Sequence, residues 1–213
     1  MSNDSCTICQ SKEPQLKRLI VGITGASGAV YGVRLLEVLT QRDEYEIHLT
    51  ISNSGATALW EELRMRVDLD NFRLDSLIGR SADHVIYHHQ SDIAAAIASG
   101  SFRTTGMIIA PCSMGTIGSI AAGISRNLVH RAADVCIKER RKLVLVPRET
   151  PLNSIHLENM LKLSQLGVVI LPAMPGFYHS PKTVDDQINF VITKLLDQFD
   201  IDTGLIQRWK ESV

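Results

Sequence analysis

Residues 142–151 read KLVLVPRETP and combine a buried strand with two charged side chains. Leu143 to Val146 form an uninterrupted apolar run rich in β-branched residues, which is typical of a strand buried on both faces of a parallel sheet. After one proline, the run is followed by Arg148 and Glu149. Ligands bind beyond the carboxyl ends of strands in open α/β sheets, so these two residues are site candidates; a solvated ion pair has the same signature.

Length and composition indicate one α/β domain. The chain has 213 residues, of which 45% are hydrophobic, and a formal net charge of -1 at pH 7. It can bury a sizeable core, and neither disorder nor a basic nucleic-acid surface is indicated. No apolar stretch approaches the roughly 20 residues that span a bilayer, and the first residues lack the apolar core of a signal peptide. We expect a cytoplasmic protein whose partners are small molecules or copies of itself, with no membrane or nucleic acid.

The cysteines fall into two classes. Cys112 and Cys136 lie in apolar surroundings and are expected to be reduced core thiols. Cys6 and Cys9 form a CxxC, but no second cysteine pair or suitably spaced histidine pair accompanies it, so no zinc site is expected. We predict that residues 1–17 form a mobile polar arm.

Four more apolar runs have the length of buried strands, and helical patterns separate them. The runs are Leu19–Thr24, Glu46–Ile51, Met107–Ala110 and Val168–Leu171. The helical patterns cover residues 29–41, 56–66, 92–98, 117–123, 154–166 and 183–199. Strands that alternate with helices predict one doubly wound, mostly parallel sheet with helices on both faces, over residues 18–199, followed by a tail of residues 200–213.

Small and polar residues follow the expected strands. After the first strand, residues 25–28 read GASG and lead into a helix. Glycines let a backbone approach a ligand and free N–H groups at a helix start attract anions, so this turn predicts a phosphate or cofactor cradle; a tight turn with a capping serine is the alternative. Ser52–Gly55, Ser113–Thr116 and Phe177–Tyr178 follow other strands. With Arg148 and Glu149, these turns define the predicted site.

The glycine spacing argues against a nicotinamide dehydrogenase. Gly25, Gly28 and Gly32 do not match G-x-G-x-x-G. The second strand ends in SNSG at residues 52–55, where a dinucleotide enzyme needs an acidic residue for the ribose. Hydroxyl groups at that position suit a phosphate or a ribityl chain better.

Four long segments, in order, resemble the UbiX-type flavin prenyltransferases, and the resemblance covers nearly everything from Arg18 to Trp209. The segments are TGASGAVYGVRLL (24–36), PCSMGTIGSIAAG (111–123), NLVHRAADVCIKERRKLVLVPRETPLNSIHLENMLKLSQLG (127–167) and PAMPGFYHSP (172–181). The resemblance implies a flavodoxin-like (Rossmann-like) domain that binds FMN. It also implies a homo-oligomer, usually a dodecamer, in which more than one subunit builds each site.

The same resemblance implies the reaction. Reduced FMN, a co-substrate, receives a dimethylallyl group from dimethylallyl phosphate at N5 and C6, without a metal. The prenylated FMN then serves UbiD-type decarboxylases in aromatic acid decarboxylation. The sequence leaves the choice between a monophosphate and a diphosphate donor open. Two alternatives are an FMN-dependent cysteine decarboxylase and a non-catalytic FMN-binding subunit.

Position by position, the resemblance implies three groups of site residues. Matches to the FMN contacts are Gly25, Ala26, Ser27, Ser52, Ser113, Met114, Gly115, Thr116 and Arg148. Matches to the donor contacts are Lys138, Arg148, Tyr178 and Lys194. The ring of Trp209 or of Tyr178 could stabilise the allyl cation through its face. Matches to the catalytic groups are Ser27, Glu149, Lys138 and Glu62, and counting leaves Glu61 as an alternative to Glu62. Lys194 stands where the family usually has arginine, which keeps the charge but loses the bidentate fork.

The chemistry of the residues agrees with such a reaction. Ionising an allylic phosphate needs positive charge at the leaving group and an electron-rich surface beside the allyl cation. Diphosphate-dependent prenyltransferases instead hold magnesium with a DDxxD motif. Residues 185–189 read DDQIN and lack the last aspartate, so we expect a metal-independent reaction.

Overall fold

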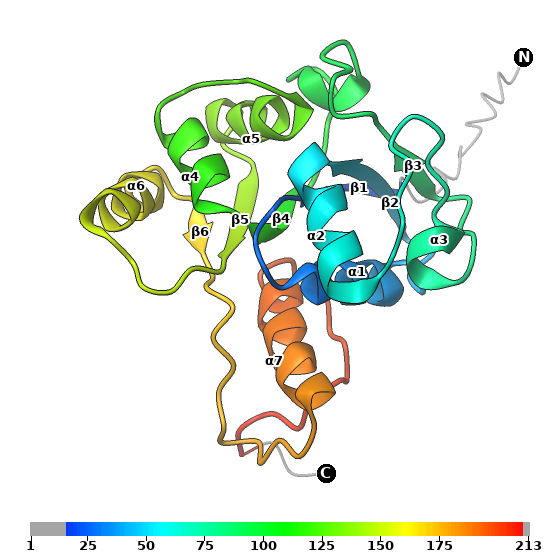
Figure 1. Cartoon of the computed structure of the whole chain (residues 1–213), viewed down its shortest axis with the longest axis vertical. Helices are drawn as coiled ribbons and strands as arrows, with labels where there is room; N and C mark the ends of the chain where they lie inside the picture. The colour runs from blue at the N-terminus through cyan, green and yellow to red at the C-terminus, as the bar shows by residue number, and fades with distance from the viewer. Residues whose placement is uncertain (1–15, 211–213) are drawn as a thin grey trace, which may run out of the picture.

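Six parallel strands form one sheet at the centre of the structure (Figure 1). The structure is a computed structural model that describes residues 16–210, so Cys6, Cys9 and nearly all of the predicted arm lie outside the described residues. The strands are β1 (Lys17–Ile23), β2 (Tyr45–Ile51), β3 (Val85–Tyr87), β4 (Gly106–Cys112), β5 (Lys142–Pro147) and β6 (Val169–Ile170).

The strand order confirms the predicted fold class. The order across the sheet is β3-β2-β1-β4-β5-β6, and every neighbouring pair is parallel. Without the short edge strand β3, the five predicted strands run 2-1-3-4-5, which is the flavodoxin order; with it, the sheet has the Rossmann order 3-2-1-4-5-6. In both descriptions the strand order reverses between β1 and β4.

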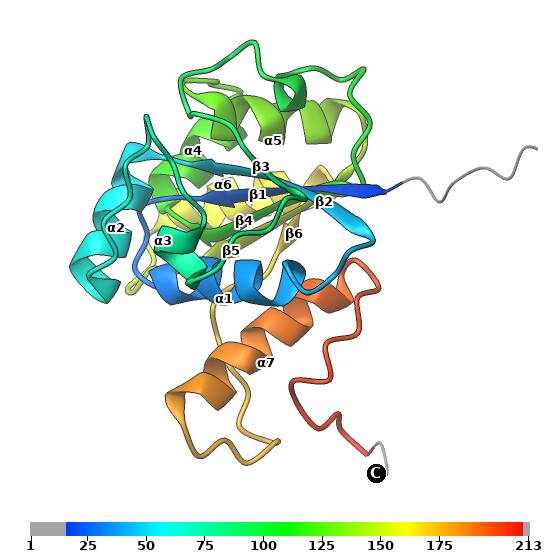
Figure 2. The same cartoon turned by 90° about the vertical axis from the view of Figure 1, so that its right-hand side faces the viewer.

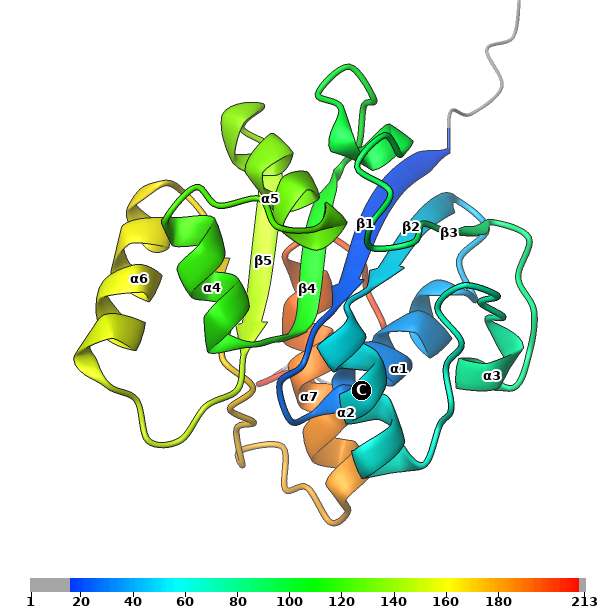
Figure 3. The ribbon, with the colours of Figure 1, turned by 45° about the horizontal axis from the view of Figure 1, so that its top comes forward.

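Helices cover both faces of the sheet (Figure 2). They are α1 (Ala29–Leu39), α2 (Asn53–Leu63), α3 (Asp75–Ile78), α4 (Met114–Ala121), α5 (Leu128–Lys138), α6 (Ser154–Gln165) and α7 (Val184–Asp197), with a 3-10 turn at Ala96–Ala98. Figure 3 shows α4 and α5 on the near side of β4 and β5 and α7 behind them. Successive side chains of a strand point to opposite faces of the sheet, so each strand contributes to a hydrophobic core on either face. In β1, Leu19, Val21 and Ile23 pack with α1 and α7, whereas Ile20 packs with α4 and α5.

Two expectations about residues 67–100 differ from the structure. The alanine-rich helix expected at residues 92–98 is wrong, since only the turn Ala96–Ala98 forms. Asp92 Oδ1 accepts a hydrogen bond from Ala94 N at 3.1 Å, and this local turn competes with a helix start. The sequence also missed β3, which pairs with β2 through three residues.

The chain after α7 packs back against the hydrophobic core that β1, α1 and α7 share. Ile201 is buried, and Leu205 and Ile206 pack against the cluster that contains α1 and α7. Within residues 16–210, no helix combines the length and apolar character needed to cross a membrane.

Candidate active site

The loops after β1 and β4 are joined at the point where the strand order reverses. Thr24 donates from its backbone N (3.2 Å) and its hydroxyl (2.9 Å) to the carbonyl oxygen of Pro111. Its hydroxyl oxygen accepts from Ser113 N at 2.9 Å. At this point α1 and α4 leave toward opposite faces of the sheet, which is the usual position of the ligand in open α/β sheets.

The loop after β2 lies against the same place. A Cβ atom on Gly25 would lie 2.4 Å from Ser54 Cβ, so only glycine allows this approach. Ser52 begins α2 by accepting a hydrogen bond from Gly55 N at 3.0 Å. Residues 24–28, 52–55 and 111–116 thus form one structure, called the loop cradle below.

Glu62, in the last turn of α2, closes one side of the loop cradle. Its Oε2 accepts from Gly28 N and Ala29 N, both at 2.9 Å. Burial acts to raise the pKa of Glu62, but the Ser27 hydroxyl, these two N–H groups and the Arg148 charge together hold it below its ordinary value. The expectation that the N–H groups at the start of α1 are free for an anion is therefore wrong at these two positions. Glu61 pairs with Arg64 instead, at 3.6 Å.

The start of α4 offers the better position for an anion. Ser113 Oγ accepts from Thr116 N at 3.2 Å, whereas the N–H groups of Met114 and Gly115 have no partner within residues 16–210. A Cβ atom on Gly115 would meet nothing closer than Ser113 Oγ at 3.9 Å, so a ligand has room to approach the backbone. These features fit the phosphate or ribityl hydroxyls of FMN.

Arg148 brings a positive charge from the end of β5 to the loop cradle. Its Nε donates to Ser27 O at 3.2 Å. The adjacent Glu149 is exposed, and its Oε1 accepts from Thr150 N at 3.1 Å. Glu149 also borders a cavity of about 30 Å³, whose other lining residues are Pro147, Leu152, Met160, Pro172 and Met174. Ser27, Ser113 and Arg148, from three separate loops, therefore meet along one edge, as the strand ends predicted.

Comparison with known proteins decides the family. The model of the family described as Flavoprotein matches residues 8–211. A flavin prenyltransferase UbiX from Halalkalibacterium halodurans is 54% identical over 191 residues, which cover 90% of this chain and 92% of the relative. The chain belongs to the UbiX-type flavin prenyltransferases.

Solved structures of this family have the same fold. A dodecameric FMN-dependent UbiX-like decarboxylase from Escherichia coli O157:H7 is 48% identical, with a TM-score of 0.82 over 91% of this chain and 100% of that chain. A UbiX protein in complex with FMN and dimethylallyl pyrophosphate is 40% identical, with a TM-score of 0.80 over 93% of this chain and 100% of that chain. An FMN-dependent cysteine decarboxylase of thioviridamide biosynthesis, at 17% identity and a TM-score of 0.53, shares the fold alone.

Three further donor-site candidates, Tyr178, Lys194 and Trp209, lie on α7 and in the segments on either side of it. Tyr178 and Trp209 meet edge to face, with ring centroids 5.5 Å apart. Tyr178 also meets Phe190 of α7 at 5.5 Å, and Lys194 Nζ lies 6.0 Å from the Phe190 ring. Residues 175–209, which include α7, are called the α7 arm below; Figure 1 shows it extending from one side of the sheet.

Lys138 lies at the opposite edge of the sheet. It ends α5, and its Nζ donates to Glu139 Oε1 at 2.7 Å. A Cβ atom on Gly100 would come within 2.8 Å of Lys138 Nζ, and both residues precede the amino ends of β4 and β5. A single chain therefore does not bring Lys138 to Arg148.

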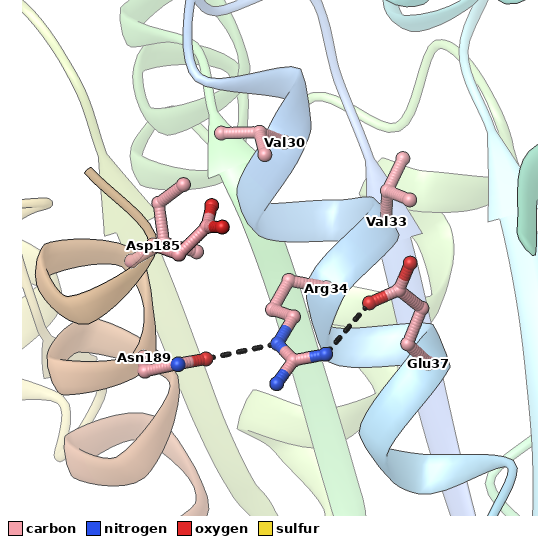
Figure 4. A pocket seen from close by; sticks show the side chains of 7 residues that line it. Val30, Val33, Arg34, Glu37, Asp185 and Asn189 are labelled. Atoms are coloured by element: carbon pink, nitrogen blue, oxygen red, sulfur yellow. Dashed lines mark hydrogen bonds and ion pairs between the residues drawn. The ribbon is translucent and has the colours of Figure 1, made fainter. Parts of the chain in front are cut away.

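A larger cleft of about 330 Å³ lies between α1 and α7, outside the loop cradle (Figure 4). The Arg34 guanidinium there already donates to Asn189 Oδ1 at 2.9 Å and to Glu37 Oε2 at 2.8 Å. Because this guanidinium is already paired within the chain, the cleft is a weaker candidate than the loop cradle for an anionic cofactor.

Sequence reasoning missed one residue that builds the loop cradle, Thr24, and one contact, that of Ser54 with Gly25. Thr24 joins two loops through three hydrogen bonds, and Ser54 packs on Gly25. The signal for Thr24 was a hydroxyl at the end of a buried strand. Ser54 belongs to the predicted turn Ser52–Gly55, but its contact with Gly25 could not be predicted, because it depends on the pairing of β1 with β2.

Proposed function

We propose that this chain prenylates reduced FMN, joining the dimethylallyl group of dimethylallyl phosphate to N5 and C6 of the flavin. The observation that carries the proposal is that the loop cradle and Arg148 lie together where the strand order reverses. The chain is also 54% identical to a flavin prenyltransferase UbiX. Reduced FMN, when bound, supplies the nucleophilic ring atoms. Every other requirement falls on side chains of the protein.

FMN binding is assigned to the loop cradle. Gly25 and Gly115 permit close approach, and Ser52, Ser113 and Thr116 offer hydroxyl groups. The free N–H groups of Met114 and Gly115 would bind an anionic or polar part of FMN, and Arg148 would neutralise charge beside Ser27. Ala26 and Ser27 complete the proposed contacts.

The donor phosphate is assigned to cations. Lys138, Arg148 and Lys194 would stabilise charge on the leaving phosphate, and Tyr178 would donate a hydrogen bond to it. The Trp209 ring would stabilise the allyl cation through its face. Glu149, with its exposed carboxylate, would take the proton lost from flavin C6. Ser27 and Glu62, whose side chains are hydrogen-bonded to each other, would fix the loop beside that carboxylate.

This assignment requires an oligomer. Lys138 and Arg148 lie at opposite edges of the sheet, so the Lys138 that completes one site would come from a neighbouring copy. The dodecameric UbiX-like structure supports a homododecamer for this chain. We further propose that the product passes to a UbiD-type decarboxylase.

Two features bear on metal use and location. Asp186 Oδ2 accepts from Lys182 N at 2.8 Å and Thr183 N at 2.9 Å, so one oxygen of this carboxylate caps α7 and is not open to magnesium. This supports metal-independent transfer. Cys112 and Cys136 are free and buried, which supports a reducing, cytoplasmic location.

The test is the mass of the bound flavin. The protein is incubated anaerobically with reduced FMN and dimethylallyl phosphate, and the flavin is then released and weighed. We expect FMN plus one dimethylallyl unit, less the proton displaced, and the same product with or without a metal chelator. Unchanged FMN that remains tightly bound would favour the non-catalytic FMN subunit.

A further inference from the structure

Arg208 anchors the chain end to α7. Its Nη2 donates to Asp197 Oδ1 at 2.7 Å and its Nη1 donates to Asp197 Oδ2 at 3.1 Å, so the pair is bidentate. A third hydrogen bond runs from Nη2 to Asp202 Oδ1 at 3.2 Å. The Arg208 and Asp197 side chains are 30% and 22% exposed, so this pair is less screened than an ordinary surface pair.

The residue after this anchor carries the indole of the proposed donor site. Trp209 is 65% exposed, and its contact with Tyr178 is a single edge-to-face meeting at 5.5 Å and 83°. One such contact contributes only about 0.5–1.5 kcal/mol, which is too little to order a chain end by itself. The last buried residue before it is Ile201, eight positions earlier.

We propose that Arg208 is a positioning residue for prenyl transfer, whose bidentate pair with Asp197 places Trp209 beside Tyr178. The inference rests on the proposed function, because it concerns the donor end of that site. Arg208 is assigned no contact with donor or flavin. It acts through the position of the Trp209 ring.

A competing explanation makes Asp197 a counter-ion of Lys194, whose Nζ lies 3.8 Å from Asp197 Oδ2. The two explanations predict opposite effects of Asp197→Asn. If Asp197 only restrains Lys194, its removal frees the ammonium and lowers the KM for the donor. If Asp197 holds the anchor, its removal releases Trp209 and raises that KM.

The experiment uses the full chain with Trp60→Phe, which leaves Trp209 as the one tryptophan of the two in the sequence. Arg208→Met, Arg208→Lys, Asp197→Asn and the double variant Arg208→Met/Asp197→Asn are compared. Arg73→Met is the matched control, because Arg73 forms a bidentate pair with Asp75 on an exposed loop, at 3.1 and 2.5 Å. Acrylamide quenching of Trp209, KM and kcat for dimethylallyl phosphate and the Kd for FMN are measured.

We expect Arg208→Met and Asp197→Asn each to increase the quenching of Trp209 and to raise the donor KM about tenfold, the effect of one lost charge-assisted pair. The double variant should be no worse than either single variant, since both remove the same pair. Arg208→Lys should recover part of the effect, and the Kd for FMN should stay unchanged throughout. Arg73→Met should leave every quantity unchanged.

Unchanged quenching in Arg208→Met, or increased quenching with an unchanged donor KM, would overturn the proposal. A lower donor KM in Asp197→Asn would do the same in favour of the counter-ion explanation. The quenching result needs no turnover, so it still reports on the anchor if the parent protein fails to prenylate FMN, which is a failure of the proposed function alone.

Discussion

The loop cradle and the α7 arm are built by different kinds of contact. In the loop cradle, backbone hydrogen bonds join three loops, as in the bonds from Thr24 N to Pro111 O at 3.2 Å and from Ser52 N to Ile23 O at 3.0 Å. In the α7 arm, ring contacts and the ion pairs of Asp197 and Asp202 surround the proposed donor residues, and Lys138 lies at the far edge of the sheet. The cofactor site is thus a property of the fold. The donor site needs the arm and, by our proposal, neighbouring copies.

The largest expected effect is on the rate of prenylation, without a change in FMN binding, and it concerns Glu149 beside the loop cradle. Glu149→Gln keeps the size of the side chain but cannot take a proton, so prenylated FMN should form about 100-fold more slowly or worse. The Kd for FMN should not change, because the loop hydrogen bonds do not involve Glu149. Product formation is followed by the mass of the flavin. Formation at the rate of the unmodified protein would remove Glu149 from the mechanism.

A second prediction addresses the distance between Lys138 and Arg148. Lys138→Met and Arg148→Met should each lose activity as pure proteins. When the two variants are unfolded together and reassembled, random mixing should restore roughly a quarter of the sites, because a complete site then takes Arg148 from one copy and Lys138 from another. The regained rate of flavin prenylation measures this fraction. No regain in a mixed oligomer would mean that each site draws both residues from one chain.

Sequence reasoning succeeded for the loop cradle because parallel strands place their carboxyl ends at one edge. The apolar runs located five of the six strands, and the turns after them supplied Gly25, Ser52 and Ser113. The contact of Glu62 with Gly28 N could not be predicted, since it depends on how the last turn of α2 folds back over α1.

The failures elsewhere also have local causes. The edge strand β3 is three residues long and has only one neighbour, which leaves too short a pattern to detect. The helix expected at residues 92–98 was assigned on alanine content, which a competing Asp92 turn overrides. In the α7 arm, Tyr178 was proposed from the end of a strand, whereas Lys194 was available only from family resemblance, because no strand end leads to it.

A third prediction disturbs the loop cradle alone. Gly25→Ala places a Cβ atom 2.4 Å from Ser54 Cβ, so the two loops must move apart. We expect a loss of about 1–3 kcal/mol in the free energy of unfolding and about tenfold weaker FMN binding. Thermal unfolding and flavin titration measure the two effects.

Two variants test whether that clash is the cause. Ser54→Gly added to Gly25→Ala should recover much of the loss, since the nearest remaining Ser54 atom is the backbone carbon at 3.0 Å. Gly118→Ala is the matched control, because its Cβ would meet only Asn159 Nδ2 at 3.5 Å. An unaltered Kd for FMN in Gly25→Ala would show that the approach of the two loops does not shape the site.

A fourth prediction concerns the pH dependence of the loop cradle. The pKa of Glu62 lies below its ordinary value of 4.5 in the folded protein, so its carboxylate stabilises the fold above pH 4.5 and loses this effect as the pH falls through the lowered pKa. Glu62→Gln should therefore lower Tm by about 2–4 °C at pH 7. The difference from the unmodified protein should shrink toward zero on acidification. A pH-independent difference in Tm would assign the effect to packing instead of charge.

The smallest expected effect lies in the α7 arm and sharpens the contrast with the loop cradle. Lys194→Arg restores the fork that the family usually has, and both oxygens of the neighbouring Asp197 are already occupied by Arg208. The added donors are thus available to a phosphate, and the KM for dimethylallyl phosphate should fall about threefold. The Kd for FMN should stay the same, because in the described part of the chain the Lys194 ammonium lies near Asp197 and the Phe190 ring, neither of which belongs to the loop cradle. A changed Kd for FMN with a constant donor KM would reverse our division of the site, placing Lys194 with the cofactor and leaving the donor phosphate to Lys138 and Arg148.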